Sequence, residues 1–252
     1  MAADSPFSVV PYSGGNSFKR VRIRHDGLIR TMLRHLGALD FVIVLGPPRH
    51  EKTHLLRDVL GEIEAGGQAD GIYVDLWQSR ADDETTFFAS LAQLMAAAPG
   101  AALPISDAAG LSSRAFQNYL LTCLQQRTRH LVLLIDHLQS IPQDLVYSLL
   151  VALRSAYNEQ MTQPTPRLVV VMTGGMNLVG LASGPTSPFN IAKPLLMPGL
   201  TPPQGLKLAA ATLAAYGTHA SEKALELLIE QAGGDTYLLP QLCAWCAEAV
   251  RG

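Results

Sequence analysis

Residues 41–53 read FVIVLGPPRHEKT, and this stretch decides how the rest of the chain is interpreted. Residues 41–45 are apolar throughout, which is typical of a strand buried on both faces of a parallel sheet. Gly46 and two prolines then predict a turn, and apolar residues return at helical spacing from Leu55 to Ile63. The stretch therefore predicts a buried strand, a tight loop and a helix that begins near Lys52.

The loop matches most of the phosphate-binding pattern G-x-x-x-x-G-K-[ST]. In that pattern, backbone N–H groups at a helix N-terminus face phosphate oxygens, and the lysine reaches the β- and γ-phosphates. Gly46, Lys52 and Thr53 match, but Glu51 stands at the second glycine. A chance match is the competing interpretation. The predicted nucleotide-binding residues are Gly46, Pro47, Pro48, Arg49, His50, Glu51, Lys52 and Thr53.

Glu51 is the main departure from the pattern. A glycine before the lysine lets the backbone approach the phosphates, whereas a glutamate adds bulk and a negative charge beside an anion. A further hypothesis is that Lys52 pairs with Glu51, so that its charge is used in an internal contact. We expect Glu51 to weaken phosphate binding and Glu51→Gly to strengthen it.

Residues 131–136 (LVLLID) predict another buried strand, and this one ends in a carboxylate. An aspartate at the end of such a strand holds the water shell of Mg²⁺ in phosphate-loop enzymes, and the threonine of the loop is a direct ligand. We therefore expect Asp136 and Thr53 to bind Mg²⁺ beside ATP or ADP. The alternative for Asp136 is a turn residue or a helix N-cap.

His137 follows, at the place where a second carboxylate usually polarises the attacking water. A neutral imidazole can act as a base, and the alternative is a substituted position with no catalytic task. Thr173 ends the strand predicted at residues 168–172, where a polar side chain senses the γ-phosphate in phosphate-loop ATPases of the additional-strand type. Turn chemistry before two glycines is the alternative for Thr173. Without a carboxylate at position 137 or an arginine after Thr173, we expect negligible turnover.

Strands and helices alternate along the chain up to about residue 200. Two more strands are predicted, at residues 72–76 and, as a shorter element, at residues 195–197. Apolar strands joined by helices imply a parallel sheet covered on both faces. We predict a flexible arm at residues 1–20, an α/β domain at 21–200 and a helical lid at 201–252. The lid is expected on the side of the sheet where the loops of the candidate site follow the strands.

Composition excludes several classes of protein. The chain has 252 residues, of which 48% are hydrophobic and 16% charged, so it is not a disordered chain. A net charge of −2 supplies no polycationic surface for nucleic acid, and three cysteines cannot form a disulfide framework. The first residues lack the features of a signal peptide, and glycines and prolines interrupt the longest uncharged stretch. We expect a cytoplasmic protein with no membrane partner.

Three further segments carry a resemblance to a known family. They are SPFNI at residues 187–191, LTPPQ at 200–204, and GGDTYL at 233–238, where Thr236 takes the place of a proline. With the strand motifs, their order resembles the AAA-like ATPase domains of bacterial signalling and conflict proteins, near the STAND and origin-recognition branches. The resemblance runs from about Arg22 to Ala249. It implies a P-loop NTPase fold of the additional-strand type, with a five-stranded parallel sheet, helices on both faces and a C-terminal helical lid.

The resemblance also implies a function. It favours a regulatory or assembly module with a degenerate ATPase site, in which ATP or ADP is a switch ligand, hydrolysis is weak or absent, and the partner is another protein or a second copy. One alternative is a pseudo-ATPase that serves as a protein-interaction scaffold. Another is a DNA-associated ATPase of the replication or transposition type.

Basic residues outside the loop have two interpretations each. The run from Lys19 to Arg24 alternates basic and β-branched residues, which suits an extended segment that contacts a phosphate backbone, or else a solvated edge. Arg154 and Arg167 are candidate arginine fingers for a neighbour's nucleotide, or else ordinary surface residues.

Overall fold

The computed structural model describes residues 7–13, 15, 18, 20–79, 83–101, 103–104, 110–162, 166–178, 180, 187 and 189–251. Backbone packing divides the chain into two compact units. The sheet unit comprises Thr31–Gly46 and Leu56–Leu196. The lid unit comprises Met1–Arg30, Pro47–Leu55 and Met197–Gly252. Each unit has a hydrophobic core of its own.

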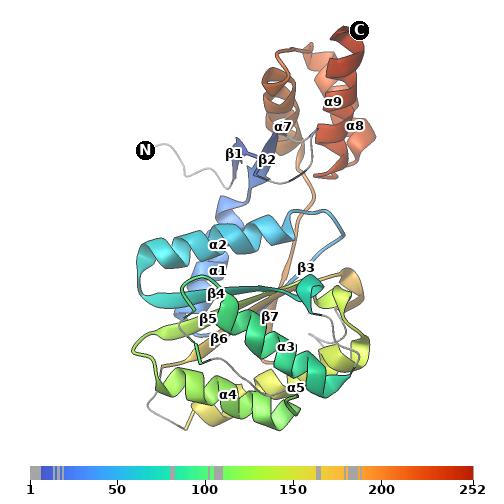
Figure 1. The fold of residues 1–252 in the computed structure, drawn as a ribbon. Coiled ribbons are helices and arrows are strands. Elements are labelled where there is room, and N and C mark those ends of the chain that lie inside the picture. Colours follow the sequence, from blue (N-terminus) through green and yellow to red (C-terminus); the bar gives the residue numbers. More distant parts are fainter. Residues whose placement is uncertain are drawn as a thin grey trace. The chain divides into compact units, whose positions relative to one another are not determined.

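The sheet unit is built on five parallel strands in the order β4-β5-β6-β3-β7 (Figure 1). Every residue of β3 and β6 is buried; β3 is apolar throughout, and β6 is apolar up to Thr173 and Gly174 at its end. β7 is an edge strand that exposes Lys193, and for this reason the prediction of a strand at residues 195–197 covered only part of it. The strands are β3 (Phe41–Leu45), β4 (Ala69–Asp75), β5 (His130–Asp136), β6 (Leu168–Gly174) and β7 (Ala192–Leu196).

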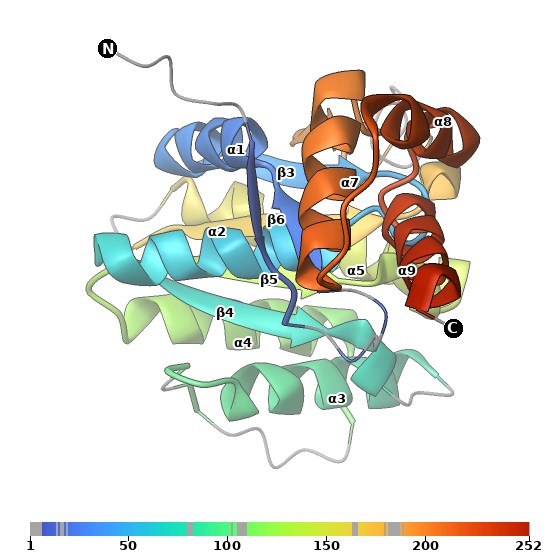
Figure 2. The same cartoon turned by 90° about the horizontal axis from the view of Figure 1, so that it is seen from above.

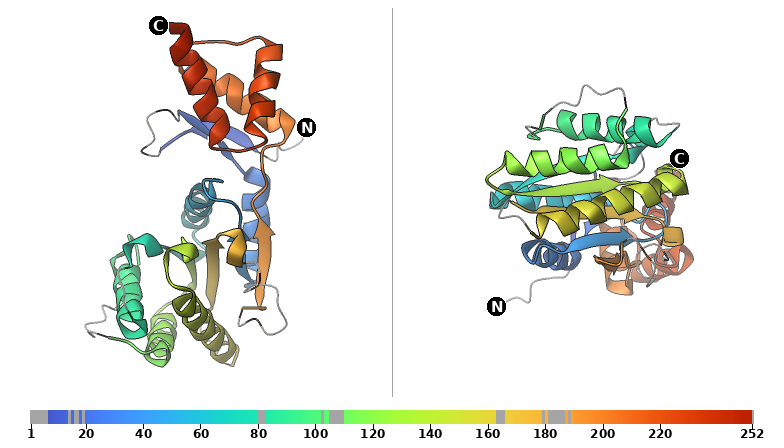
Figure 3. Two further views of the ribbon diagram at one scale, coloured as in Figure 1. Left: turned by 90° about the vertical axis from the view of Figure 1, so that its right-hand side faces the viewer. Right: turned by 90° about the horizontal axis from the view of Figure 1, so that it is seen from below.

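Helices cover both faces of this sheet. Seen from below, α3 (Glu84–Ala97), α4 (Ser113–Gln125) and α5 (Gln143–Gln160) lie over one face (Figure 3). The opposite face is covered by the parts of α1 (Asp26–Gly37) and α2 (Lys52–Gly66) that belong to the sheet unit (Figure 2). α2 crosses β4 so closely that a Cβ on Gly71 would lie 2.4 Å from Leu60 Cδ1.

Side-chain caps begin two of these helices. The Asp83 carboxylate accepts hydrogen bonds from the backbone N–H groups of Thr85 and Thr86 at 2.8 and 3.0 Å, and so caps α3. Ser112 caps α4 by accepting from Ala115 N at 3.2 Å. Hydrogen bonds from the side chain of Thr85 and the backbone of Thr86, with smaller contributions from the Thr86 side chain and the Thr85 backbone, lower the pKa of the Asp83 carboxyl to about 2.

The lid unit combines a β-hairpin with three helices. The expected loose arm at residues 1–20 was wrong for residues 8–11, which form β1 (Ser8–Pro11) and pair antiparallel with β2 (Val21–Arg24). The hairpin is ordered because Phe7 and Ile23 enter the lid core. The helices are α7 (Pro202–Ala215), α8 (Glu222–Ala232) and α9 (Leu238–Arg251).

Local signals in the sequence set the ends of the lid helices. Thr201 and Gln204 form a capping box at the start of α7, with Thr201 N donating to Gln204 Oε1 at 2.8 Å. Ser221 caps α8, which ends at Gly233 in the left-handed region with a φ of 55°. The predicted α/β architecture with C-terminal helices is confirmed. In the described part of the chain, no helix has the length and apolar character that a membrane crossing requires.

Candidate functional site

The carboxyl ends of three strands meet at one edge of the sheet. Gly46 N, directly after β3, donates to Gly174 O at the end of β6 at 3.3 Å. His137 N, directly after β5, donates to Thr173 Oγ1 at 3.2 Å. The predicted convergence of these strand ends is therefore confirmed within the sheet unit.

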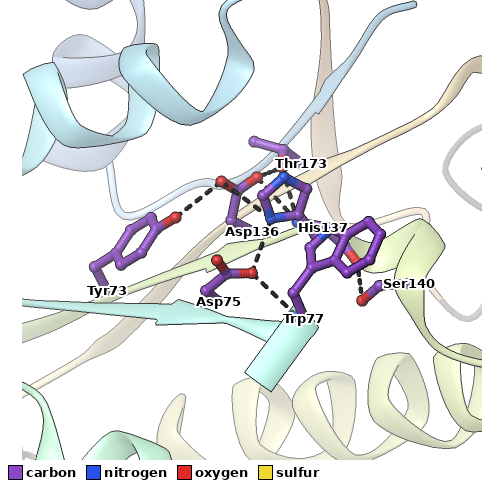
Figure 4. Close-up of polar contacts among 7 residues, drawn as sticks. All are labelled: Tyr73, Asp75, Trp77, Asp136, His137, Ser140 and Thr173. Carbon is purple, nitrogen blue, oxygen red and sulfur yellow. Dashed lines mark hydrogen bonds and ion pairs between the residues drawn. The ribbon is translucent and has the colours of Figure 1, made fainter. Parts of the chain in front are cut away.

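Asp136 lies at the centre of a polar network at this edge (Figure 4). Its side chain is 1% exposed. Oδ1 accepts hydrogen bonds from the Thr173 hydroxyl and from His137 N, the latter at 2.9 Å, and Oδ2 accepts from the Tyr73 hydroxyl at 2.9 Å. A buried carboxylate is expensive unless it is hydrogen-bonded, and here protein groups supply three donors. Asp136 is therefore neither a helix cap nor a simple turn residue.

Tyr73 and Asp75 on β4 belong to the same network. Burial, followed by the charge of Asp136, raises the pKa of the Tyr73 hydroxyl well above its ordinary value, so the phenol remains a hydrogen-bond donor at neutral pH. The Asp75 carboxylate lies 2.8 Å from His137 Nδ1 and accepts from Trp77 N at 3.0 Å. Asp75 and Asp136 are direct partners in the β4–β5 register.

The position of His137 is fixed by its backbone as well as its ring. Its φ of 62° and ψ of 45° place it in the left-handed region, which starts the turn after β5. Ser140 donates to the His137 carbonyl oxygen from both Oγ and N, at 2.7 and 2.8 Å. The Trp77 ring stands edge-on to the imidazole at 5.9 Å between centroids, and Trp77 is 68% exposed (Figure 4). His137 is thus held in one orientation by Asp75 and by its own turn.

The loop after β3 has an unusual backbone. Arg49 and Glu51 have φ values of 64° and 61°, in the left-handed region that favours glycine. Left-handed residues that alternate with right-handed ones turn successive N–H groups toward one side, which is the geometry of backbone anion sites. Pro47 and Pro48 contribute no N–H. The conformation at Glu51 explains physically why glycine is the better residue at this position.

The side chains of Glu51 and Lys52 make separate contacts. Glu51 Oε2 lies 2.9 Å from His54 Nδ1, one turn along α2, and the Glu51 side chain is 4% exposed. Lys52 Nζ donates to Pro47 O at 2.6 Å, so the ammonium group closes over its own loop. The His54 ring also packs against Tyr12, with centroids 5.1 Å apart.

Within the lid unit, the loop also contacts the segment that precedes α9. The Thr236 hydroxyl donates to Arg49 O at 3.2 Å. The Arg49 guanidinium lies 4.5 Å from the centroid of the Tyr237 ring, in a cation–π contact. A proline at position 236 could not donate this hydrogen bond, so the departure from the G-G-x-P-Y-L pattern adds a link between the loop and the lid helices.

Comparisons with known proteins identify the fold. No family model matches the chain, and no curated protein matches it. The structure is similar to Cdc6p from Pyrobaculum aerophilum, with a TM-score of 0.64 and 18% identity over 90% of this chain and 62% of that one. The structure is also similar to the Aeropyrum pernix ORC1 protein in complex with DNA, with a TM-score of 0.61 and 16% identity over 90% of this chain and 60% of that one. Its TM-score with a Walker-type ATPase of Pyrococcus abyssi is 0.63, with 18% identity over 91% of this chain and 68% of that one.

The fold is that of an AAA-type P-loop ATPase. β6 stands between β3, which precedes the loop, and β5, which carries Asp136, and this is the additional-strand arrangement. The chain spans 62% of the length of the Cdc6p chain and 60% of the length of the ORC1 chain.

The AAA-type fold gives the loop and Asp136 their expected places in the chain, and the residue types suit Mg²⁺ and a nucleotide. The Asp136 carboxylate and the Thr53 hydroxyl are the hard oxygen ligands that Mg²⁺ prefers. The left-handed residues of the loop and the ammonium of Lys52 suit a phosphate. Each part taken by itself has suitable chemistry, the loop for a phosphate and Asp136 for a magnesium ion, although both oxygens of Asp136 already accept hydrogen bonds from the protein.

The other predicted basic residues are engaged within the fold. Of the basic run, Arg22 is 7% exposed and Arg24 pairs with Asp26 at 2.5 Å, while Lys19 lies outside the described residues. Arg20 is exposed and lies 5.4 Å from the Tyr216 ring. The β2 segment therefore presents less free positive charge than its sequence suggests.

Each candidate arginine finger also has internal partners. Arg154 Nη1 donates to Ser187 O at 3.2 Å and to Asn190 Oδ1 at 2.8 Å. Arg167 donates to the carbonyl of Gln160, the last residue of α5.

The sequence did not identify Tyr73 and Asp75 as site residues or His54 as the partner of Glu51. The first two alternate along β4 near its carboxyl end, and that period of two was a signal that they share a face with Asp136. His54 follows Glu51 by three residues at the start of a helix, where such pairs are neighbours.

Proposed function

We propose that this chain is a nucleotide-binding module of the AAA type that works in a DNA-associated assembly. ATP or ADP acts as its switch ligand, and hydrolysis is slow or absent. The observation that carries the proposal is the loop backbone, which is left-handed at Arg49 and Glu51 directly before Lys52 begins α2. That combination supports binding of an anion by backbone N–H groups at a helix N-terminus.

Each residue of the module has a role in this proposal. Lys52 leaves Pro47 O and neutralises the phosphates, while the loop N–H groups orient them. Thr53 and Asp136 are the residues that would hold Mg²⁺, which would supply further neutralisation of the phosphate charge. Thr173 keeps the Asp136 carboxylate in place through its hydroxyl, which is a positioning role.

Slow hydrolysis is supported by the surroundings of His137. A water-polarising residue needs a basic atom that faces the attacking water. An imidazole at this position differs from a carboxylate in reach and charge, and the Nδ1 atom of His137 lies 2.8 Å from the Asp75 carboxylate. The carboxylate that usually takes this task is absent from position 137.

The association with DNA rests on the fold comparisons. Cdc6p and ORC1 have this fold, and the ORC1 structure contains DNA. These similarities favour the replication-type alternative over the signalling and conflict role that the sequence first suggested. Arg20 directly precedes β2 and is the exposed arginine of the basic run among the described residues, and we assign it the contact with a phosphate backbone. A partner chain or a second copy would complete the assembly.

Calorimetric titration with ADP and with ATP tests nucleotide binding. We expect binding by the wild type and a loss of at least about fiftyfold in affinity in Lys52→Ala, because the charge–phosphate contact is removed. Lys223→Ala, which changes an exposed lysine in the first turn of α8, is the matched control and should bind normally. A wild type that binds neither nucleotide would refute the proposal and support the pseudo-ATPase scaffold.

Fluorescence anisotropy with a labelled duplex tests the association with DNA. Affinity should fall steeply with salt, and Arg20→Ala should weaken it and reduce the salt slope by about one. Nucleotide binding without any DNA binding at low salt would favour a signalling switch of the STAND type instead.

A further inference from the structure

Arg49 carries the exposed positive charge of the loop at residues 46–53, whereas Lys52 is buried. The carbonyl oxygen of Arg49 accepts a hydrogen bond from the Thr236 hydroxyl at 3.2 Å, and its guanidinium lies 4.5 Å from the centroid of the Tyr237 ring. These residues all belong to the lid unit. A residue other than glycine with a φ of 64° costs free energy and persists only where its surroundings fix it. The segment before α9 therefore holds both the backbone and the side chain of Arg49.

The Tyr237 ring is itself held in place. Asp235 Oδ1 accepts hydrogen bonds from the backbone N–H groups of Tyr237 and Leu238 at 2.7 and 2.9 Å, and these bonds fix the start of α9. The Phe18 ring meets the Tyr237 ring edge-on, with the centroids 5.4 Å apart and the planes at 90°. The guanidinium of Arg49 thus lies against a ring whose position is set by two other parts of the same unit.

The contact with Tyr237 leaves the hydrogen-bond donors of Arg49 available. An aromatic ring attracts a cation through its quadrupole but offers no oxygen atom to the N–H groups. Among the described residues, the Arg49 guanidinium has no hydrogen bond or ion pair with the protein, whereas Lys52 Nζ donates to Pro47 O at 2.6 Å. A planar fork of N–H donors matches the oxygens of a phosphate. Arg49 also gives the loop its net positive charge, because the charges of Glu51 and Lys52 cancel each other.

We infer that Tyr237 positions Arg49 as a second cation, beside Lys52, for the phosphates of the nucleotide. The inference rests on the proposed nucleotide-binding function. Arg49 contacts the phosphates through its N–H groups, and Tyr237 acts through Arg49, so Tyr237 is a positioning residue. The charge of Arg49 also offsets that of Glu51, which stands where the phosphate-loop pattern has a glycine.

The test is a double-mutant cycle on ADP affinity, measured by calorimetry for the wild type, Arg49→Ala, Tyr237→Leu and the double variant. Tyr237→Phe is the conservative variant, because it keeps the ring that faces the guanidinium and removes only the hydroxyl. Arg20→Ala is the matched control, since Arg20 is another exposed arginine of the lid unit and lies 5.4 Å from the Tyr216 ring. Thermal unfolding followed by circular dichroism verifies the fold of each variant.

The cycle gives separable outcomes. We expect Arg49→Ala to lose about tenfold in affinity and Tyr237→Leu about fivefold, while Tyr237→Phe and Arg20→Ala stay within about twofold of the wild type. In the Arg49→Ala background, Tyr237→Leu should cost less than about a further twofold, because its effect passes through Arg49. Wild-type affinity in Arg49→Ala, or an undiminished loss from Tyr237→Leu in that background, would overturn the inference alone. A wild type that does not bind ADP would overturn the proposed function, and the inference with it.

Discussion

The loop at residues 46–53 and the strand-end network around Asp136 both depart from the usual pattern of an AAA-type ATPase, but in opposite ways. The loop departs in its backbone, since Glu51 occupies a left-handed position that suits glycine. The network departs in its hydrogen bonding, since Tyr73 and Thr173 enclose a carboxylate that the fold offers to a metal. The loop therefore has a strained backbone, whereas the Asp136 carboxylate of the network already has hydrogen-bond donors on both oxygens.

This difference predicts which substitutions should change ligand affinity and which should change stability. Pro47, Pro48 and Arg49 are exposed, so changes at these three positions should alter ligand affinity more than stability. Asp136 and Thr173 are almost fully buried, so changes there should alter stability first. The following predictions test this division, from the largest expected effect to the smallest.

Asp136→Ala should destabilise the protein by about 3 kcal/mol, because three hydrogen-bond donors lose their acceptor in a buried place. Urea unfolding followed by circular dichroism gives the free energy. Asp144→Ala, an exposed carboxylate in the first turn of α5, is the control and should stay within about 0.5 kcal/mol of the wild type. Equal stability of the two variants would mean that the network is not what holds these strand ends.

Glu51→Gly should raise the affinity for ADP about tenfold, because glycine adopts a φ of 61° without strain and the carboxylate no longer repels the phosphates. Glu51→Ala separates the two causes, since it removes the charge but keeps a Cβ in the left-handed region. A gain in both variants assigns the effect to charge, and a gain in glycine alone assigns it to the backbone. Tight wild-type binding with no gain in either variant would show that the pair with His54 already turns the carboxylate away from the phosphates.

Thr236→Val should cost only about 1 kcal/mol of stability, since it removes the single hydrogen bond to Arg49 O. Its effect on ADP affinity tests whether the link between the loop and the helices matters for binding. We expect less than about a threefold change, because Arg49 keeps its contact with Tyr237. A loss comparable to that of Lys52→Ala would mean that the lid helices shape the phosphate site.

The central strands of the sheet could be predicted from the sequence because they are buried on both faces. β3, β5 and β6 consist almost wholly of buried apolar residues, and such runs stand out in any composition. The hairpin strand β1 was missed because its four residues are only partly buried and are followed by a segment rich in glycine and serine. β1 is ordered by its contacts with β2 and α7. α7 is distant in the chain, and β2 is only weakly indicated by the sequence.

The residues of the candidate site can be proposed from the sequence, but their contacts cannot. Lys52, Thr53 and Asp136 follow from motif and spacing, whereas the partner of each side chain depends on which strands become neighbours. Tyr73 reaches Asp136 only because β4 pairs with β5 in a register that sets Asp75 opposite Asp136. The hypothesis that Lys52 pairs with Glu51 did not anticipate His54 or the carbonyl of Pro47 as their partners.

The central claim is that the chain holds a nucleotide at the loop and does not turn it over at the strand ends. The most direct measurement incubates the purified protein with radiolabelled ATP and Mg²⁺, separates it from free nucleotide by gel filtration, and identifies the retained nucleotide by chromatography. The account predicts that ATP is retained unhydrolysed by the wild type and is lost in Lys52→Ala. Steady conversion of ATP to ADP that is abolished by Asp136→Asn would contradict the account and would make His137 the candidate base.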